Sequence, residues 1–176
     1  MIPTKKLAVI AMLVAQASVL HFLESLLPNP MPIPGVKLGL ANIITLLALV
    51  IFDFKTAVQI TILRTILGSL LSGTLFGVGF FMSFSGALTA TCGMAIILRS
   101  CPGFSLVGIS VAGAIAHNLG QLIMAALILN FSGILFYLPV MLLFSVPTGF
   151  ITGLLVKELV EYTKSTNRFD TFFQDQ

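Results

Sequence analysis

The sequence contains few charged residues and few of the side chains that support chemistry. Only 9% of its 176 residues are charged, no tryptophan is present, and there are two cysteines. A soluble domain carries about 25% charged residues, so this composition excludes an ordinary soluble protein. Cys92 and Cys101 do not have the spacing of a metal site and indicate no disulfide. The net charge of +3 lies in loops and tails and does not indicate nucleic-acid binding.

Acidic residues are especially scarce. Asp53 is the only aspartate before Asp170, so the sequence lacks the paired aspartate-rich motifs that bind metal-diphosphate complexes. It also lacks a Gly-rich phosphate loop, a nucleophile elbow and a cluster of metal ligands. We therefore expect no catalytic residue, no cofactor and no metal, in a protein that is not an enzyme. An ATPase signature is missing as well, so active transport would need separate ATPases.

Apolar residues are abundant, at 57% of the chain, which is enough for about six spans of roughly 20 residues. The first apolar run continues through Leu27, which favours a retained span over a cleaved signal peptide. We expect one transmembrane domain over residues 1–160 and a short cytoplasmic tail over residues 161–176. Pro139 and Pro147 predict a kink or break in the last span. The expected transmembrane helices cover residues 7–27, 37–52, 56–72, 74–98, 106–130 and 134–156.

Basic residues in the loops predict the orientation. If the N-terminus lies inside, only Lys37 falls on the outer side. The basic residues on the inner side are then Lys5, Lys6, Lys55, Arg99, Lys157, Lys164 and Arg168. Such a bias follows the positive-inside rule. We therefore expect a multi-pass protein of the cell membrane with both termini in the cytoplasm.

Polar side chains inside the expected spans lie at or beyond the midplane, towards the outer surface. Arg64 is near the middle of the third span, where its burial costs at least about 2.5–3.5 kcal/mol. It either faces a substrate or forms a structural pair. Glu24 is the only acidic group in the outer half, and the helical rise places it roughly a dozen ångströms above Arg64.

The remaining polar residues give two readings, a binding site or ordinary satisfied core groups. His21 and Glu24 share one face of the first span, and His117 and Gln121 share one face of the fifth. Arginine, lysine and histidines against one carboxylate favour an anionic ligand such as a carboxylate or a phosphate. The expected substrate-binding residues are Arg64, Lys37, Asn42, His117, Asn118 and Gln121, with Glu24 and His21 at the rim.

Small residues recur at intervals that let helices approach closely. Ala11 and Ala15 form an Ala-x-x-x-Ala pair on the first span, and Gly149 and Gly153 form a similar pair on the sixth. A longer stripe on the fifth span consists of Gly108, Ala112, Ala116 and Gly120. Packing inside the bundle is the simpler explanation for each of these faces.

The stretch Pro34-Gly35-Val36-Lys37-Leu38-Gly39-Leu40-Ala41-Asn42 resembles the membrane family known as heptaprenyl diphosphate synthase component I, or Gx transporter. Six spans, two inner termini and the alanine pair also make the chain similar to the substrate-binding (S) component of energy-coupling factor transporters. The resemblance covers about residues 5–160. It implies an all-α integral membrane protein with an S-component-like bundle of six transmembrane helices.

The resemblance to S components also implies partners. A small anionic solute, such as an isoprenoid- or vitamin-related compound, would bind in an outward-facing pocket capped by the connector Pro32–Val36. Ala11 and Ala15 would dock onto a transmembrane coupling subunit that two cytoplasmic ATPases drive. The alternative is a non-catalytic membrane accessory subunit of a prenyl diphosphate synthase.

Overall fold

The computed structural model describes residues 4–26 and 39–165, which form α-helices and one 3₁₀ helix, with no strand in these two ranges. Five of the α-helices are long and apolar enough to cross a membrane, and α2 is a shorter apolar helix. The prediction of an all-α membrane protein is confirmed. The elements are α1 (Thr4–Leu26), α2 (Asn42–Ile51), α3 (Phe54–Leu71), α4 (Val78–Ser100), α5 (Leu106–Leu129), η1 (Ser132–Tyr137) and α6 (Leu138–Ser165).

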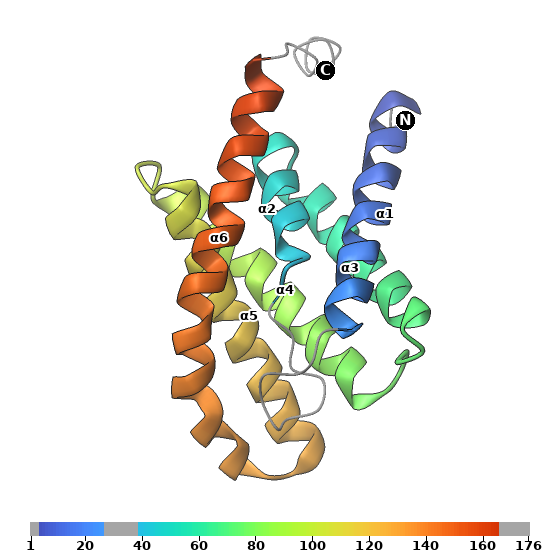
Figure 1. The fold of residues 1–176 in the computed structure, drawn as a ribbon, viewed down its shortest axis with the longest axis vertical. Coiled ribbons are helices and arrows are strands. Elements are labelled where there is room, and N and C mark those ends of the chain that lie inside the picture. Colours follow the sequence, from blue (N-terminus) through green and yellow to red (C-terminus); the bar gives the residue numbers. More distant parts are fainter. Residues whose placement is uncertain (1–3, 27–38, 166–176) are drawn as a thin grey trace.

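Successive helices run in opposite directions along the bundle, so α1 begins and α6 ends at the same, upper end of the molecule in Figure 1. The most extensive packing is between α4 and α5, between α5 and α6, and between α1 and α3. Gly149 and Gly153 of α6 lie directly against the backbone of Val111 and Val107 of α5. The glycine pair on α6 therefore serves packing inside the bundle.

The starts of α2 and α4 differ from the predictions for physical reasons. Gly39 has a φ of 81°, and its carbonyl accepts the N–H of Asn42, so a turn precedes α2 and the helix has ten residues. α4 begins at Val78 because a turn with positive φ at Gly73 and Phe76 follows α3.

The sixth predicted span is divided at its start and extended at its end. The 3₁₀ helix η1 gives way to α6 at Leu138, immediately before Pro139, where a missing backbone donor costs little. Pro147 lies inside α6, and the helix continues to Ser165, beyond the expected end at residue 156.

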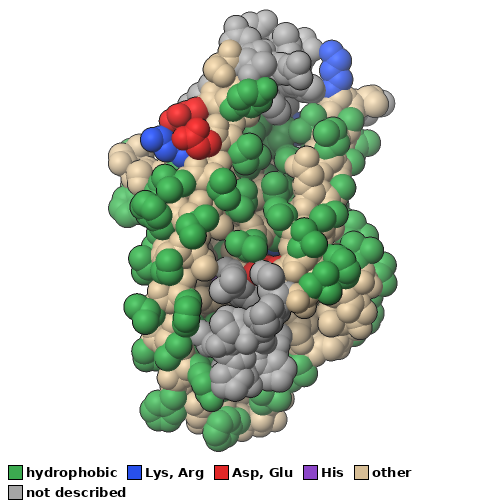
Figure 2. Space-filling view, in the orientation of Figure 1, with side chains coloured by type: hydrophobic (Ala, Val, Ile, Leu, Met, Phe, Trp, Pro, Cys, Tyr) green, Lys and Arg blue, Asp and Glu red, His purple; other side chains and the backbone are tan. Residues whose placement is uncertain are grey.

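Buried apolar residues form two clusters at different heights in the bundle. One contains Ile60 of α3 and Met94 of α4, and the other contains Met82 of α4 and Leu122 of α5. Along α4, Gly86 falls between the two clusters. A layer of buried polar side chains occupies this intermediate height. Figure 2 shows that charged side chains gather at the upper end of the visible face, whereas its flanks are largely hydrophobic.

Candidate functional site

The intermediate height of the bundle contains seven of the eight residues predicted from the sequence to form the binding site. None of the seven is more than 8% exposed. They are His21, Glu24, Asn42, Arg64, His117, Asn118 and Gln121. The eighth, Lys37, and the connector Pro32–Val36 lie outside the described residues.

The centre of this layer is the start of α2, which lies partway along the bundle and not at its end (Figure 1). The carboxylate of Glu24 on α1 accepts the backbone N–H groups of Gly39 and Leu40, the second at 3.3 Å. Backbone N–H groups before a helix carry partial positive charge and suit a carboxylate. Glu24 therefore joins the end of α1 to the entry of α2.

Arg64 reaches the same point from α3. One of its terminal nitrogens donates a hydrogen bond to Oδ1 of Asn42 at 2.8 Å, and the side chain is 2% exposed. Glu24 and Arg64 are therefore linked through the start of α2, because Glu24 bonds to Gly39 and Leu40 and Arg64 bonds to Asn42.

His117 and Gln121, one turn apart on α5, complete the group. Their Nε2 atoms are 2.8 Å apart. Both lie against Gly86 of α4, where an added methyl group would be 2.7 Å from Cγ of Gln121 and 3.1 Å from Cε1 of His117. The His117 ring also lies beside Gly39, 3.4 Å from where a β-carbon would stand. Glycine at both positions lets the helix and the turn approach the ring closely.

Two predicted site residues lie elsewhere in the layer. His21 packs on Gly68 of α3, where a methyl group would be 2.6 Å from the ring. Asn118 points to α6, and its Nδ2 donates to the carbonyl of Met141 at 3.0 Å and to Oγ of Ser145 at 2.7 Å. The structure thus brings together Glu24, Asn42, Arg64, His117 and Gln121 around Gly39, and it places Asn118 in the contact between α5 and α6.

A seam of hydroxyl groups between α3 and α4 was not predicted from the sequence. Thr61 of α3 bonds to Thr91 of α4 at 3.0 Å and to Thr45 of α2 at 3.3 Å, all three fully buried. Further along the same antiparallel pair, Ser69 and Ser83 are buried, and their Oγ atoms lack a hydrogen-bond partner within the described part of the chain. The recurrence of a hydroxyl every fourth residue, at positions 61, 65 and 69, is the signal that could have revealed this seam.

No group of three or more histidine, cysteine or acidic side chains in residues 4–26 and 39–165 is placed to hold a metal ion. The site therefore consists of one guanidinium, one carboxylate, amides, an imidazole and hydroxyls. Such a set binds through hydrogen bonds and charge.

Comparison with known proteins then gives a family. Residues 13–159 match the family described as heptaprenyl diphosphate synthase component I. The chain belongs to that family. This confirms the family resemblance inferred from the stretch around Gly39, and the matched range contains the entire buried polar layer. No curated protein and no solved structure gives a match.

Proposed function

We propose that this member of the heptaprenyl diphosphate synthase component I family is the substrate-binding membrane subunit of an energy-coupling factor importer. It captures a small anionic solute in the polar layer from the outer side of the cell membrane, and both of its termini are cytoplasmic. The observation that carries the proposal is the burial of Arg64 inside an apolar bundle with one of its donors unused. An isoprenoid- or vitamin-related anion is the solute class that the family resemblance favours.

Arg64 is costly to bury and is only partly satisfied. Its Nε has no hydrogen-bond partner among the described residues. The carboxylate of Glu24 accepts hydrogen bonds from the backbone of Gly39 and Leu40, just before α2. Charged groups within membrane helices mark substrate pathways, and arginine suits carboxylate and phosphate oxygens because its donors form a planar fork.

The hydroxyls of Ser69 and Ser83 are further hydrogen-bond donors, in addition to those of Arg64. Because the Thr61–Thr91 bond fixes the antiparallel register of α3 and α4, Ser69 and Ser83 lie at one height, about 12 Å beyond that bond. An oxyanion bound near Arg64 would find these unused hydroxyls on the outer side of the layer. Buried hydroxyls without partners are uncommon in proteins and support a ligand or ordered water at this height.

The distribution of charge supports the orientation. The described basic residues outside the polar layer lie at the end where α1 begins and α6 ends, where charged side chains gather in Figure 2. The turn 72–77 and the segment 130–137, at the opposite end, contain no lysine or arginine. By the positive-inside rule, the upper end in Figure 1 is cytoplasmic.

The exposed face of α1 has the composition expected of a docking surface for another helix. Ala8, Ala11 and Ala15 are exposed along it, and Gln16 is exposed beside them near the middle of the helix. Small residues allow a second helix to approach, and an amide side chain within the membrane gains a hydrogen bond from such a neighbour. In the proposed importer, this neighbouring helix belongs to the coupling subunit.

The first test is Arg64→Ala, with Lys157→Ala as the control for loss of a positive charge outside the layer. Native mass spectrometry of the purified wild type identifies the anion that remains bound, and titration with that anion then gives its affinity. We expect Arg64→Ala to lower affinity by about 2 kcal/mol or more, roughly thirtyfold, through loss of a desolvated charged contact. Unchanged affinity in a folded Arg64→Ala protein contradicts the proposal.

The second test separates docking from binding. Ala11→Leu and Ala15→Leu add bulk on the exposed face, and Val146→Leu adds it at an exposed site on α6. We expect the two alanine variants to lose uptake in cells while their melting temperature and ligand affinity match the wild type. If either variant transports normally or fails to fold, that face is not the docking surface.

The family's name supports a second candidate, a non-catalytic membrane accessory subunit of a prenyl diphosphate synthase. Purification from native membranes separates the two. A coupling subunit and two ATPases that co-purify support the importer, whereas a soluble prenyl synthase supports the accessory role.

A further inference from the structure

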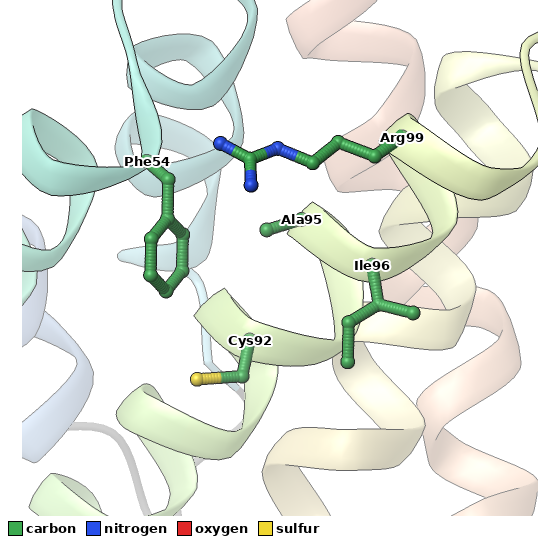
Figure 3. A pocket seen from close by; sticks show the side chains of 5 residues that line it. All are labelled: Phe54, Cys92, Ala95, Ile96 and Arg99. Atoms are coloured by element: carbon green, nitrogen blue, oxygen red, sulfur yellow. The ribbon is translucent and has the colours of Figure 1, made fainter.

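A groove outside the polar layer lies between the first turn of α3 and the last two turns of α4. Its volume is about 250 Å³, and it is lined by Phe54, Cys92, Ala95, Ile96 and Arg99. Figure 3 shows the guanidinium of Arg99 extending across the groove towards the Phe54 ring, with the other side chains along one helix. The proposed function uses none of these residues.

The groove has a polar end and an apolar length. Cys92, Ile96 and Arg99 follow one another at helical spacing along α4, so the groove runs for about 10 Å along that helix. Cys92 is exposed and Ile96 is 63% exposed, so the groove opens sideways on the flank of the bundle. Arg99 stands at the end of α4, at the same end of the bundle as the start of α1.

The charge at that end is available for a ligand. The Cζ of Arg99 lies 5.8 Å from the centre of the Phe54 ring, and Arg99 forms no ion pair with a carboxylate of the described residues. Lys55, next to Phe54 in the chain, is also exposed. The groove therefore combines an apolar wall with the cation of Arg99 at its end, and a second exposed cation follows Phe54 in the chain.

We propose that this groove binds one anionic phospholipid from the leaflet that surrounds the upper end of the bundle. An acyl chain lies along Cys92 and Ile96, and the phosphate lies at Arg99 and Lys55. Charge complementarity selects this occupant, because basic residues at the membrane surface attract anionic headgroups, whereas a zwitterionic lipid gains little net attraction from them. The inference is independent of the importer function.

A simpler role for Arg99 makes a different prediction. An arginine at the end of a membrane helix can stack on an aromatic ring and extend to the interface without selecting any lipid. In that case the charge of the lipid headgroup changes neither the amount of lipid bound in the groove nor the environment of Cys92.

The test uses the full chain in detergent, with phosphatidylglycerol and phosphatidylcholine of identical acyl chains as probes in native mass spectrometry. Arg99→Gln has Lys157→Gln as its control. Ile96→Trp fills the groove, and Ile123→Trp places the same bulk at a comparably exposed site on α5. We expect phosphatidylglycerol to bind more tightly than phosphatidylcholine. Arg99→Gln should weaken phosphatidylglycerol about fivefold, the factor for one basic residue near an anionic surface.

The two native cysteines give a second measurement, in which the groove keeps all of its own side chains while Cys92 is followed. Cys101→Ser leaves Cys92 inside the groove, and Cys92→Ser leaves the exposed Cys101 beyond its end. Phosphatidylglycerol should slow the reaction of Cys92 with a maleimide and leave that of Cys101 unchanged.

Several results overturn the proposal. Equal affinity for the two lipids does so, as does equal weakening by Ile96→Trp and Ile123→Trp. Protection of both cysteines, or of neither, also overturns it. Protection of Cys92 by a soluble prenyl diphosphate but not by phosphatidylglycerol shows that the groove has a different occupant.

Discussion

The hydrogen bond between Arg64 and Asn42 is the contact that most directly tests the polar layer. Arg64→Met keeps the unbranched stem of the side chain and removes the guanidinium, and Asn42→Leu keeps size and removes the acceptor. The single variants and the double variant form a thermodynamic cycle. The interaction energy from this cycle is the contribution of the pair, freed from the separate costs of each substitution.

The structure sets the expected magnitude. The bond is 2.8 Å long, is formed by a charged donor and lies between side chains that are 2% and 8% exposed. A hydrogen bond to a charged group contributes about 1.5–3 kcal/mol. For a protein of this size that is about 3 °C or more in melting temperature. In Asn42→Leu the guanidinium stays buried but loses this acceptor, so Asn42→Leu alone should be strongly destabilising.

The assay is thermal unfolding in detergent, followed by a signal that reports helix content. Asn118→Leu combined with Arg64→Met is the matched control, because Asn118 is equally buried in the layer but bonds to α6. The changes in stability caused by Asn118→Leu and Arg64→Met should be additive within about 0.5 kcal/mol. Additive effects of Asn42→Leu and Arg64→Met would refute the contact and, with it, the arrangement of charges around the start of α2.

Two further predictions concern stability. Asp53→Ala removes the cap of α3 and should cost about 1 kcal/mol at pH 7. Hydrogen bonding from the Thr56 backbone lowers the pKa of Asp53 below its usual 3.8, so this difference from wild type should be full above that pH and fade as the pH falls below it, measured by detergent melting. Gly149→Ala places a methyl group 2.5 Å from Cα of Val111, where overpacking of about 1–3 kcal/mol outweighs the roughly 1 kcal/mol gained in helix propensity. Gly103→Ala, in open space, should change the melting temperature little, and equal effects of the two substitutions would contradict close packing of α5 and α6.

The helices were predictable because long apolar runs between turn residues leave few alternatives in a membrane. The start of α2 was not, because the helical pattern of apolar residues continues through Gly39 to Leu40. The positive φ of Gly39 and the Glu24 carboxylate determine that boundary. The carboxylate bonds to a residue fifteen positions away, and local propensity contains no such contact.

The candidate site was predictable in composition but not in arrangement. The polar residues inside the predicted apolar spans include every side chain that the structure places around Gly39. Helical rise alone put Glu24 well above Arg64, because it ignores the inclination of one helix to another. Asn118 and Gln121 are close in sequence, yet one bonds to α6 and the other to His117. Which face meets which neighbour is a property of packing.

In the proposed importer, the two functions of α1 are separated along one rigid helix. Its buried face ends in Glu24, bonded to the entry of α2, and its exposed face carries Ala11 and Ala15 about 14 Å or more away along the axis. A partner helix that docks on the alanines and shifts α1 therefore displaces the Glu24 carboxylate from the backbone of Gly39 and Leu40. Since Glu24 bonds to the turn that precedes Asn42, and Asn42 bonds to Arg64, this displacement changes the surroundings of Arg64 without contact between partner and ligand. In the proposed importer, we therefore expect docking and release of the anion to be coupled through a single helix, with Glu24 bonded to the start of α2 in the undocked protein and separated from it in the docked one.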